Sequence, residues 1–258
     1  LEERLNGLHR GIIVHGVLAD VYRALTTEAL TPLECSGLPR AGELLRHHLE
    51  RRLSRMASIG SPGELRLLGW EVSRLTWGLL VYDAERGGPS APGQLEYALP
   101  SDGVDLGGIR ISGRIDRVDA PPAGSPVFVI DYKSGAQAYG PRFVEKRALQ
   151  VPLYLAALRV LWPEVDVAGG AYAALSDLTV RGAVRADMAT HIGGWLSEKH
   201  YVDQADLDAE VEACLDVARA AAEGIRLGRI PAEPDGDCRS GCTFRPICRT
   251  SRKVVRWG

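Results

Sequence analysis

GRIDRVD at residues 113–119 and SPVFVIDYKSG at residues 125–135 are the two segments that decide how this chain folds. Both are short runs of apolar residues bounded by turn-forming residues, which is typical of β-strands. A third run, QLEYALP at residues 94–100, precedes them, and we expect the second strand to extend back to Gly107. The three runs predict a meander, with residues 119–126 as the loop before its last strand.

Charged residues interrupt these apolar strands. Asp116 lies in the second strand, and Asp131 and Lys133 end the third. Charges are costly to bury unless they meet a cation or one another. If neighbouring antiparallel strands bring Asp116 and Asp131 together, two carboxylates converge on one site. Such hard oxygen ligands suit Mg²⁺ or Mn²⁺.

Strand alternation predicts the surroundings of that metal. Asp131 and Lys133 share one face and Tyr132 points to the other, so Tyr132 would contribute its backbone carbonyl rather than its ring. The ammonium of Lys133 would orient an attacking water and offset charge on a phosphate, while the metal lowers the pKa of the water. The alternative is that Asp116 pairs with Arg114 or Arg117, and that Asp131 and Lys133 lie at a solvated strand end.

Hydrophobic periodicity predicts helices before and after the meander. Their order, helices, three strands, helix, strand and helix, predicts a mixed sheet flanked by helices. We expect helices over residues 1–25, 41–57, 62–85, 142–161 and 206–227, a connector over 31–40, a strand buried on both faces over 167–174, and a strand or hairpin over 176–187.

Composition limits the class of protein without identifying its function. The chain has 258 residues, 45% hydrophobic and 25% charged, with a net charge of -2, so a nucleic-acid partner would need a local basic surface. Basic residues cluster in RHHLERRLSR (46–55) and near the C-terminus, where they form either a binding site or a solvated face. We expect a soluble, cytoplasmic protein with no membrane partner. Because it begins at Leu1 within a helical pattern, we also expect it to be a piece of a longer polypeptide.

Four motifs in order carry a family resemblance. RGIIVHGVL (10–18), GRIDRVD (113–119), VIDYKSG (129–135) and QVPLYLAAL (150–158) resemble the motif set of RecB-like nucleases of the PD-(D/E)xK superfamily, including the AddB type of helicase-nuclease subunit. The resemblance runs from about Gly11 to about Cys248.

The resemblance implies an α/β, restriction-endonuclease-like core of helix, three-stranded meander, helix and strand, with extra N-terminal and C-terminal helices. It implies one nuclease domain over 1–258, with a helical insertion at 26–90 and a cysteine-containing segment at 235–258. The implied activity is an Mg²⁺- or Mn²⁺-dependent deoxyribonuclease, with exonuclease favoured over endonuclease action. DNA, and a helicase or other repair subunit, would be its partners in recombination or repair. A catalytically inactive DNA-binding or scaffold module with the same fold is the alternative.

The resemblance also assigns residues. Asp116, Asp131 and Lys133 occupy the signature positions, and His15 matches a first-helix histidine that serves as an additional metal ligand. Gln150 and Tyr154 match a Q-x-x-x-Y pattern; four residues apart on a helix, they share a face, where they would contact a DNA phosphate or steady the lysine. A tyrosine packed in the core is the alternative. Glu96, in the first strand, is either an outer ligand or solvent-facing.

Cys238, Cys242 and Cys248 resemble part of the iron-sulfur staple of the AddB type. A [4Fe-4S] cluster normally needs four thiolates, and only three are grouped here, so the fourth ligand is missing or is supplied by Cys35 or Cys214. The spacing also departs from the pattern, because three residues separate Cys238 from Cys242 where two are expected. Zinc is the alternative metal. Free cysteines or one disulfide are also compatible with the sequence, and we expect Cys214 to pack as a small apolar residue.

Overall fold

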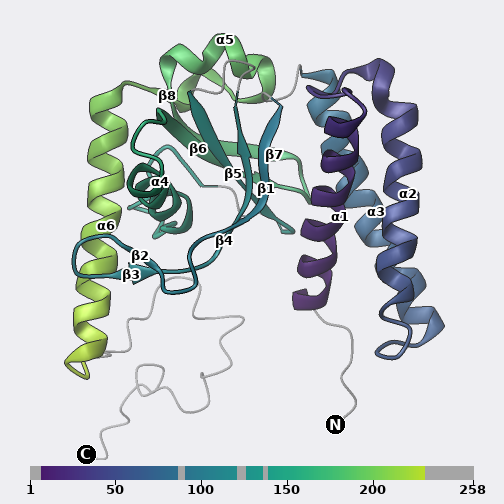
Figure 1. Ribbon diagram of the computed structural model, residues 1–258, viewed down its shortest axis with the longest axis horizontal. Helices are drawn as coiled ribbons and strands as arrows, with labels where there is room; N and C mark the ends of the chain where they lie inside the picture. The colour runs from purple at the N-terminus through teal and green to yellow at the C-terminus, as the bar shows by residue number, and fades with distance from the viewer. Residues whose placement is uncertain (1–6, 87–90, 121–125, 136–138, 230–258) are drawn as a thin grey trace, which may run out of the picture.

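A six-stranded mixed sheet forms the centre of the computed structural model, which describes residues 7–86, 91–120, 126–135 and 139–229. Helices lie on both sides of this sheet (Figure 1), so the mixed sheet flanked by helices is confirmed. The strand order is β1-β4-β5-β6-β7-β8, with bounds β1 Pro92–Ala98, β4 Arg114–Asp119, β5 Val127–Lys133, β6 Val167–Ala174, β7 Thr179–Arg185 and β8 Tyr201–Val202.

The meander predicted from the sequence is formed by β1, β4 and β5. Both of its pairings are antiparallel. β6 then pairs with β5 in parallel, which requires a crossover, and α4 (Gln150–Leu161) lies in that crossover. All eight residues of β6 are buried, as its small apolar composition predicts. β7 lies within the predicted range 176–187 and pairs with β6 antiparallel.

The second predicted strand is shorter than expected. β4 begins at Arg114, whereas residues before it form a separate hairpin of β2 (Val104–Asp105) and β3 (Arg110–Ile111). The cause is local backbone geometry, because Gly107 and Gly108 have φ angles of 70° and 88°. Glycine adopts this left-handed region at no steric cost, and the chain reverses there instead of continuing as a strand.

Three helices form a layer on one side of the sheet (Figure 1). They are α1 (Gly7–Thr27), α2 (Leu38–Ser54) and α3 (Pro62–Glu85). α3 has its predicted bounds and begins with a capping box between Ser61 and Glu64. α2 starts and ends three residues earlier than predicted, because the connector tightens into the 3-10 turn η1 (Cys35–Gly37) immediately before it. These helices share one apolar core with β5 and β6, which includes Leu18, Leu45, Leu75, Leu79, Phe128, Ile130 and Ala171.

The other face of the sheet packs against α4 and α6 (Gln204–Arg226). α4 begins eight residues later than predicted, because Arg147 has a φ of 52° and residues before it form turns. α6 begins two residues earlier than predicted, since Asp203 is its N-cap and accepts a hydrogen bond of 2.7 Å from the backbone N–H of Asp206. Short elements that were not predicted join β7 to α6: η2 Ala186–Met188, α5 Ala189–Ile192, η3 Gly193–Trp195 and η4 Glu198–His200. Among the helices of the described ranges, none has the length and apolar character needed to cross a membrane.

Candidate active site

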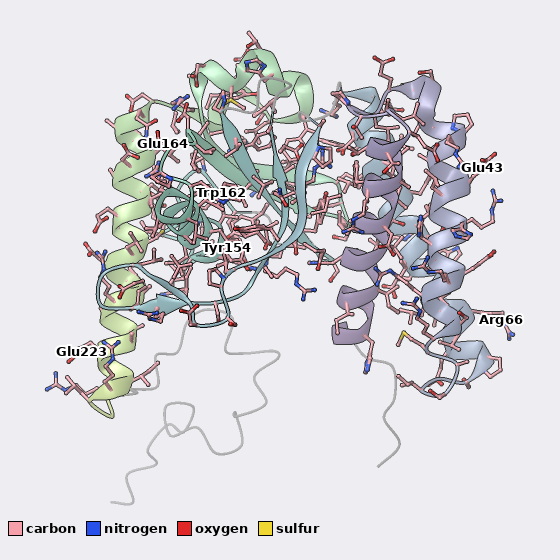
Figure 2. The ribbon with its side chains drawn as sticks, in the orientation of Figure 1. Glu43, Arg66, Tyr154, Trp162, Glu164 and Glu223 are labelled. Carbon is pink, nitrogen blue, oxygen red and sulfur yellow. The ribbon has the colours of Figure 1, made fainter. Side chains whose placement is uncertain are left out.

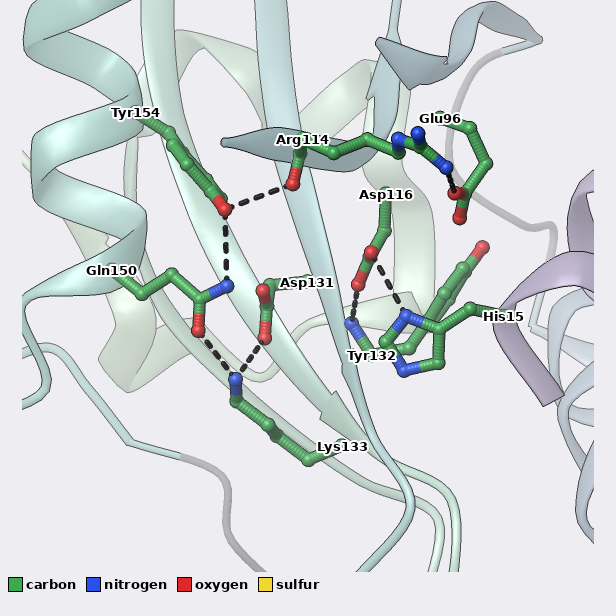
Figure 3. Close-up of polar contacts among 9 residues, drawn as sticks. All are labelled: His15, Glu96, Arg114, Asp116, Asp131, Tyr132, Lys133, Gln150 and Tyr154. Atoms are coloured by element: carbon green, nitrogen blue, oxygen red, sulfur yellow. Dashed lines mark hydrogen bonds and ion pairs between the residues drawn. The ribbon is translucent and has the colours of Figure 1, made fainter. Parts of the chain in front are cut away.

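Asp116 and Asp131 lie at the same end of the β4–β5 pair. The last paired residues of the two strands are Arg117 and Ile130, so Asp116 and Asp131 are the next residue on each strand. The backbone N–H of Tyr132 donates a hydrogen bond of 2.8 Å to Oδ2 of Asp116. Both acids are buried, at 8% and 1% exposure, and Figure 3 shows their carboxylates on the same side of the strands. The structure therefore brings the two expected acids to one place.

His15 and Glu96 complete an acidic and imidazole cluster around Asp116. Nδ1 of His15, on α1, lies 2.9 Å from Oδ1 of Asp116. One ligand atom from each of His15, Glu96 and Asp116 falls within 4.8 Å of the others. Asp131 does not belong to this group of three, although it was expected to share a metal with His15 and Asp116. Glu96, which the sequence left undecided between ligand and solvent, faces the site.

Glu96 faces the site because the strand alternation breaks at its position. Its φ is 55°, which is uncommon for a residue other than glycine and costs about 1–3 kcal/mol. Leu95 packs against the core on the α1 side, whereas Tyr97 packs against the core on the α4 side. Residues two apart in a regular strand would share a face. The kink therefore turns Glu96 towards the rim of the sheet.

In β4, the strand paired with β1, the regular alternation of faces is also interrupted, at the position opposite Glu96. Ile115 belongs to the core on the α4 side, whereas Arg117 lies against the ring of Tyr22 on the α1 side. Asp116 is the residue between them. Glu96 and Asp116 thus both project from the rim between the two cores, where α1 brings His15. This local geometry, rather than a regular sheet surface, creates the cluster.

Lys133 lies on the side of Asp131 that is away from Asp116. Its Nζ is 2.7 Å from Oδ2 of Asp131 and donates a hydrogen bond of 2.6 Å to Oε1 of Gln150. The contact with Asp131 is a buried ion pair, and among the described residues no other donor reaches this Oδ2. A buried carboxylate oxygen in this condition is well suited to a cation.

Gln150 and Tyr154 fix the position of Lys133. Nε2 of Gln150 donates 3.1 Å to the hydroxyl of Tyr154, which in turn donates 2.8 Å to the backbone carbonyl of Arg114. This chain of hydrogen bonds holds the amide with its oxygen towards Lys133 (Figure 3). Of the two expected roles, the arrangement provides the one in which the pair steadies the lysine. Tyr154 is also part of the core on the α4 side.

The electrostatics of the site favour a bound cation. Burial, and then the charge of Asp116, raises the pKa of Asp131 to about 6. Burial on its own would lower the pKa of His15, but the hydrogen bond and charge of Asp116 outweigh it and raise that pKa. Two acids therefore repel each other at neutral pH. A divalent ion between them would remove this repulsion.

The donor set fits Mg²⁺ or Mn²⁺. Carboxylate oxygens of Asp116 and Glu96 and an imidazole nitrogen of His15 converge, and the carboxylate of Asp131 follows at the next strand, β5. Carboxylates are the usual ligands of Mg²⁺ and Mn²⁺, and an imidazole is compatible with Mn²⁺. Oδ2 of Asp131 is buried and has the ammonium of Lys133 as its partner among the described residues. The residues present therefore fit a divalent metal centre.

The ion pairs of Arg114 and Arg117 join these arginines to acids other than Asp116. Arg114 pairs with Glu96 at 3.1 Å. Arg117 points to the opposite face and donates two hydrogen bonds to Asp119, with Asp83 of α3 at 3.3 Å.

These buried charges form a network that the sequence reasoning missed. Asp83 also accepts hydrogen bonds from the hydroxyl of Tyr22 and from Nε1 of Trp195, and the hydroxyl of Tyr132 lies 3.4 Å from Arg117. The sequence RVD could have indicated the pairing of Arg117 with Asp119. Residues two apart in a strand share a face, and an arginine and an aspartate on one face are suited to form an ion pair. The network braces the two strands that carry Asp116 and Asp131.

Only two of the five cysteines lie in the described residues. Cys214 is buried in α6, and burial raises the pKa of its thiol to about 12, so it packs as a small apolar residue. Cys35 is exposed, and its Sγ donates to the carbonyl of Ala84 at 3.5 Å. Cys238, Cys242 and Cys248, the residues expected to hold a cluster, lie outside the described ranges.

A family comparison agrees with this geometry. The profile of the PD-(D/E)XK nuclease superfamily matches residues 1–249, which is nearly the whole chain. A comparison with curated proteins gives no match. The superfamily is named for two acids and a lysine at strand ends, and Asp116, Asp131 and Lys133 are so placed. The chain belongs to the PD-(D/E)XK nuclease superfamily.

Proposed function

We propose that this chain is a metal-dependent deoxyribonuclease whose catalytic centre is formed by Asp116, Asp131 and Lys133. The observation that carries the proposal is the placement of these groups: Asp116 and Asp131 follow the last paired residues of β4 and β5, and Nζ of Lys133 lies 2.7 Å from the buried Oδ2 of Asp131. Two buried carboxylates beside an ammonium are the groups that a divalent ion and an attacking water require.

Each residue has a separate role in this proposal. His15, Asp116, Asp131 and the backbone carbonyl of Tyr132 would hold an Mg²⁺ or Mn²⁺ ion, and Glu96, which lies in one cluster with His15 and Asp116, would be a further carboxylate ligand. The bound ion lowers the pKa of a water and offsets phosphate charge. Lys133 orients that water and stabilises the negative charge that develops on the phosphate. Gln150 and Tyr154 keep its ammonium in place.

The finer properties of the enzyme are also proposed here. The order of the four sequence motifs supports a RecB-like enzyme of DNA repair or recombination, acting as an exonuclease beside a helicase subunit or domain. A [4Fe-4S] cluster on Cys238, Cys242 and Cys248, with a fourth ligand from elsewhere, is part of the same proposal. Its role would be to attach the C-terminal segment to the rest of the domain, away from the site of hydrolysis.

A cleavage assay tests the function. Purified protein is incubated with single-stranded and double-stranded DNA in Mg²⁺, in Mn²⁺ and in EDTA. We expect cleavage with either metal, none in EDTA, and none with Asp131→Ala or Lys133→Ala. Arg40→Ala is the matched control, because Arg40 is an exposed residue of α2 paired with Glu28 and Glu43. Intact DNA after prolonged incubation with metal would overturn the enzymatic proposal, and DNA binding without cleavage would support the scaffold alternative.

A further inference from the structure

A cleft extends from the acidic cluster along α1. It has a volume of about 900 Å³ and is lined on one side by α1 and on the other by β1 and β4. His15, Glu96 and Asp116 line the end of this cleft at the site already described. Arg23 and Arg52 line it as well. The cleft therefore joins the metal-binding acids to a pair of arginines that the proposed chemistry does not use.

The side chain of Arg52, on α2, reaches this cleft by passing over α1 at Gly16. Arg52 lies near the end of α2 in the basic segment 46–55, and its guanidinium occupies the space that a side chain at position 16 would fill. A Cβ on Gly16 would lie 2.2 Å from Nη1 of Arg52. Gly16 follows His15 directly in α1. The glycine thus admits a guanidinium from another helix next to a proposed metal ligand.

A single carboxylate holds both arginines at the cleft. Oδ2 of Asp20 accepts 2.9 Å from Nε and lies 2.8 Å from Nη2 of Arg52, and Oδ1 accepts 3.2 Å from Nη1 of Arg23. His48 lies 3.8 Å from the same acid. Two guanidiniums sharing one carboxylate leave excess positive charge. Their side chains are 28% and 56% exposed, so they keep donors available to a ligand.

We propose that Arg52 and Arg23 form a phosphate subsite for single-stranded DNA, next to the phosphate that is cleaved. This proposal rests on the proposed nuclease function and names its substrate class. Asp20 is five residues beyond His15 on α1, about 7.5 Å along the helix axis. That separation suits a neighbouring phosphate of an extended strand. Arginine forks bind phosphate through paired hydrogen bonds, and Asp20 fixes Arg52 in advance.

The dimensions of the cleft favour one strand over a duplex. Its volume of about 900 Å³ is that of a site for one drug-sized ligand, which corresponds to very few nucleotides. Ile12, also in the lining, is 60% exposed and offers an apolar surface to a sugar or base. Gly7 and Gly11, where an added Cβ would meet no neighbouring atom, let the strand approach the backbone of α1 closely. A duplex would have to open its end before it could enter.

Binding measured in EDTA tests the subsite without cleavage. A labelled single-stranded oligodeoxynucleotide is titrated at several salt concentrations against the wild-type protein, Arg52→Ala, Gly16→Ala and the control Arg40→Ala. We expect Arg52→Ala to weaken binding about tenfold and to lower the slope of log K against log salt by about 0.7, the value for one lost contact to a single strand. Arg40→Ala should change neither quantity.

Gly16→Ala separates position from charge. Alanine is the better helix former, so this variant should fold, but its methyl group displaces the guanidinium of Arg52. We expect it to reproduce the loss of affinity of Arg52→Ala, and the double variant to be no weaker than either single one. The rise in Tm on adding Mg²⁺ should be unchanged in all three, because none removes a metal ligand. Folding is checked by circular dichroism.

The outcomes distinguish the two proposals. Equal affinities and salt slopes for wild type and Arg52→Ala would overturn the subsite, whether or not the protein cleaves DNA. Absence of oligonucleotide binding would overturn it too. Arg52-dependent binding in a protein that never cleaves DNA with Mg²⁺ or Mn²⁺ would retain the subsite and remove the nuclease function. A blunt duplex that binds as tightly as the single strand would overturn the preference for one strand.

Discussion

Arg117 of β4 donates hydrogen bonds of 2.5 Å and 2.7 Å to the two carboxylate oxygens of Asp119, on the face of the strand turned away from Asp131. Both residues are buried, at 2% and 0% exposure. The pair lies next to Asp116 in the chain, and through Asp83 it also contacts α3. The strand that carries Asp116, a proposed catalytic acid, is therefore stabilised on its opposite face by a buried ion pair.

Replacing Arg117 with methionine should destabilise the fold by about 3–5 kcal/mol, because it leaves Asp119 and Asp83 buried without their cation. Denaturant unfolding measures the change. Arg40→Met is the control, since that exposed arginine should change stability little. A small effect of Arg117→Met would mean that the network is not required for stability.

The pKa of Asp131 leads to a prediction about stability in the absence of metal. Its pKa rises from 3.8 to about 6 on folding, so the folded protein binds more protons than the unfolded chain between these values, and stability falls as pH rises through this window. Asp131→Asn removes that loss. We expect the metal-free variant to have a higher Tm than wild type at pH 8, and the difference to shrink towards pH 4. Thermal unfolding in EDTA at both pH values checks this, and equal shifts at both would contradict it.

Added Mg²⁺ should reverse the order of the Tm values of wild type and Asp131→Asn. In the proposed site Mg²⁺ would be held by Asp131 and Asp116 of the folded protein, so it should raise the Tm of wild type and leave that of Asp131→Asn nearly unchanged. The measurement is a titration of Tm with MgCl₂. A matching rise in both proteins would show that the ion binds elsewhere.

Tyr154→Phe should lower kcat by about three- to tenfold, the value of one hydrogen bond, because Gln150 loses the hydroxyl that orients its amide towards Lys133. KM and the free energy of unfolding should change little, since the ring stays in its core. Gln150→Ala should lower kcat by at least as much. A change confined to KM would indicate a contact with DNA instead.

Glu96→Gln should weaken Mg²⁺ binding about 10- to 100-fold while leaving the fold intact. Glutamine keeps the size of the side chain and removes its charge, which isolates the contribution of the carboxylate. Isothermal titration with Mg²⁺ measures the affinity. An unchanged affinity would show that Glu96 only pairs with Arg114.

The elements that sequence patterns predicted well are those whose pattern reports burial directly. β5 and β6 are continuous apolar runs, and α3 begins at a capping box and ends before glycines. The positions of Asp131 and Lys133 on one face follow from strand alternation alone. These features depend on residues close to one another in the chain, so a single sequence contains them.

What the sequence could not predict depends on distant partners or unusual backbone. The network around Asp83 joins residues as far as 112 positions apart, and no local pattern connects them. The inward turn of Glu96 requires a left-handed φ that few glutamates adopt. The late start of α4 follows from the same kind of conformation at Arg147. The role of Gly16 depends on the packing of α2 against α1, which no local sequence pattern indicates.

α2 and α3 share one core with α1, β5 and β6. Residues 26–90 were expected to be an insertion, a segment that a related chain could lack. Here the segment supplies Asp83 to the charges behind β4 and Arg52 to the cleft. A truncated protein without these helices would expose part of the inner side of the sheet to water, and the guanidinium of Arg117 would lose its contact with Asp83. A related chain with a shorter segment 26–90 would therefore need other residues in β4 in place of its buried charges.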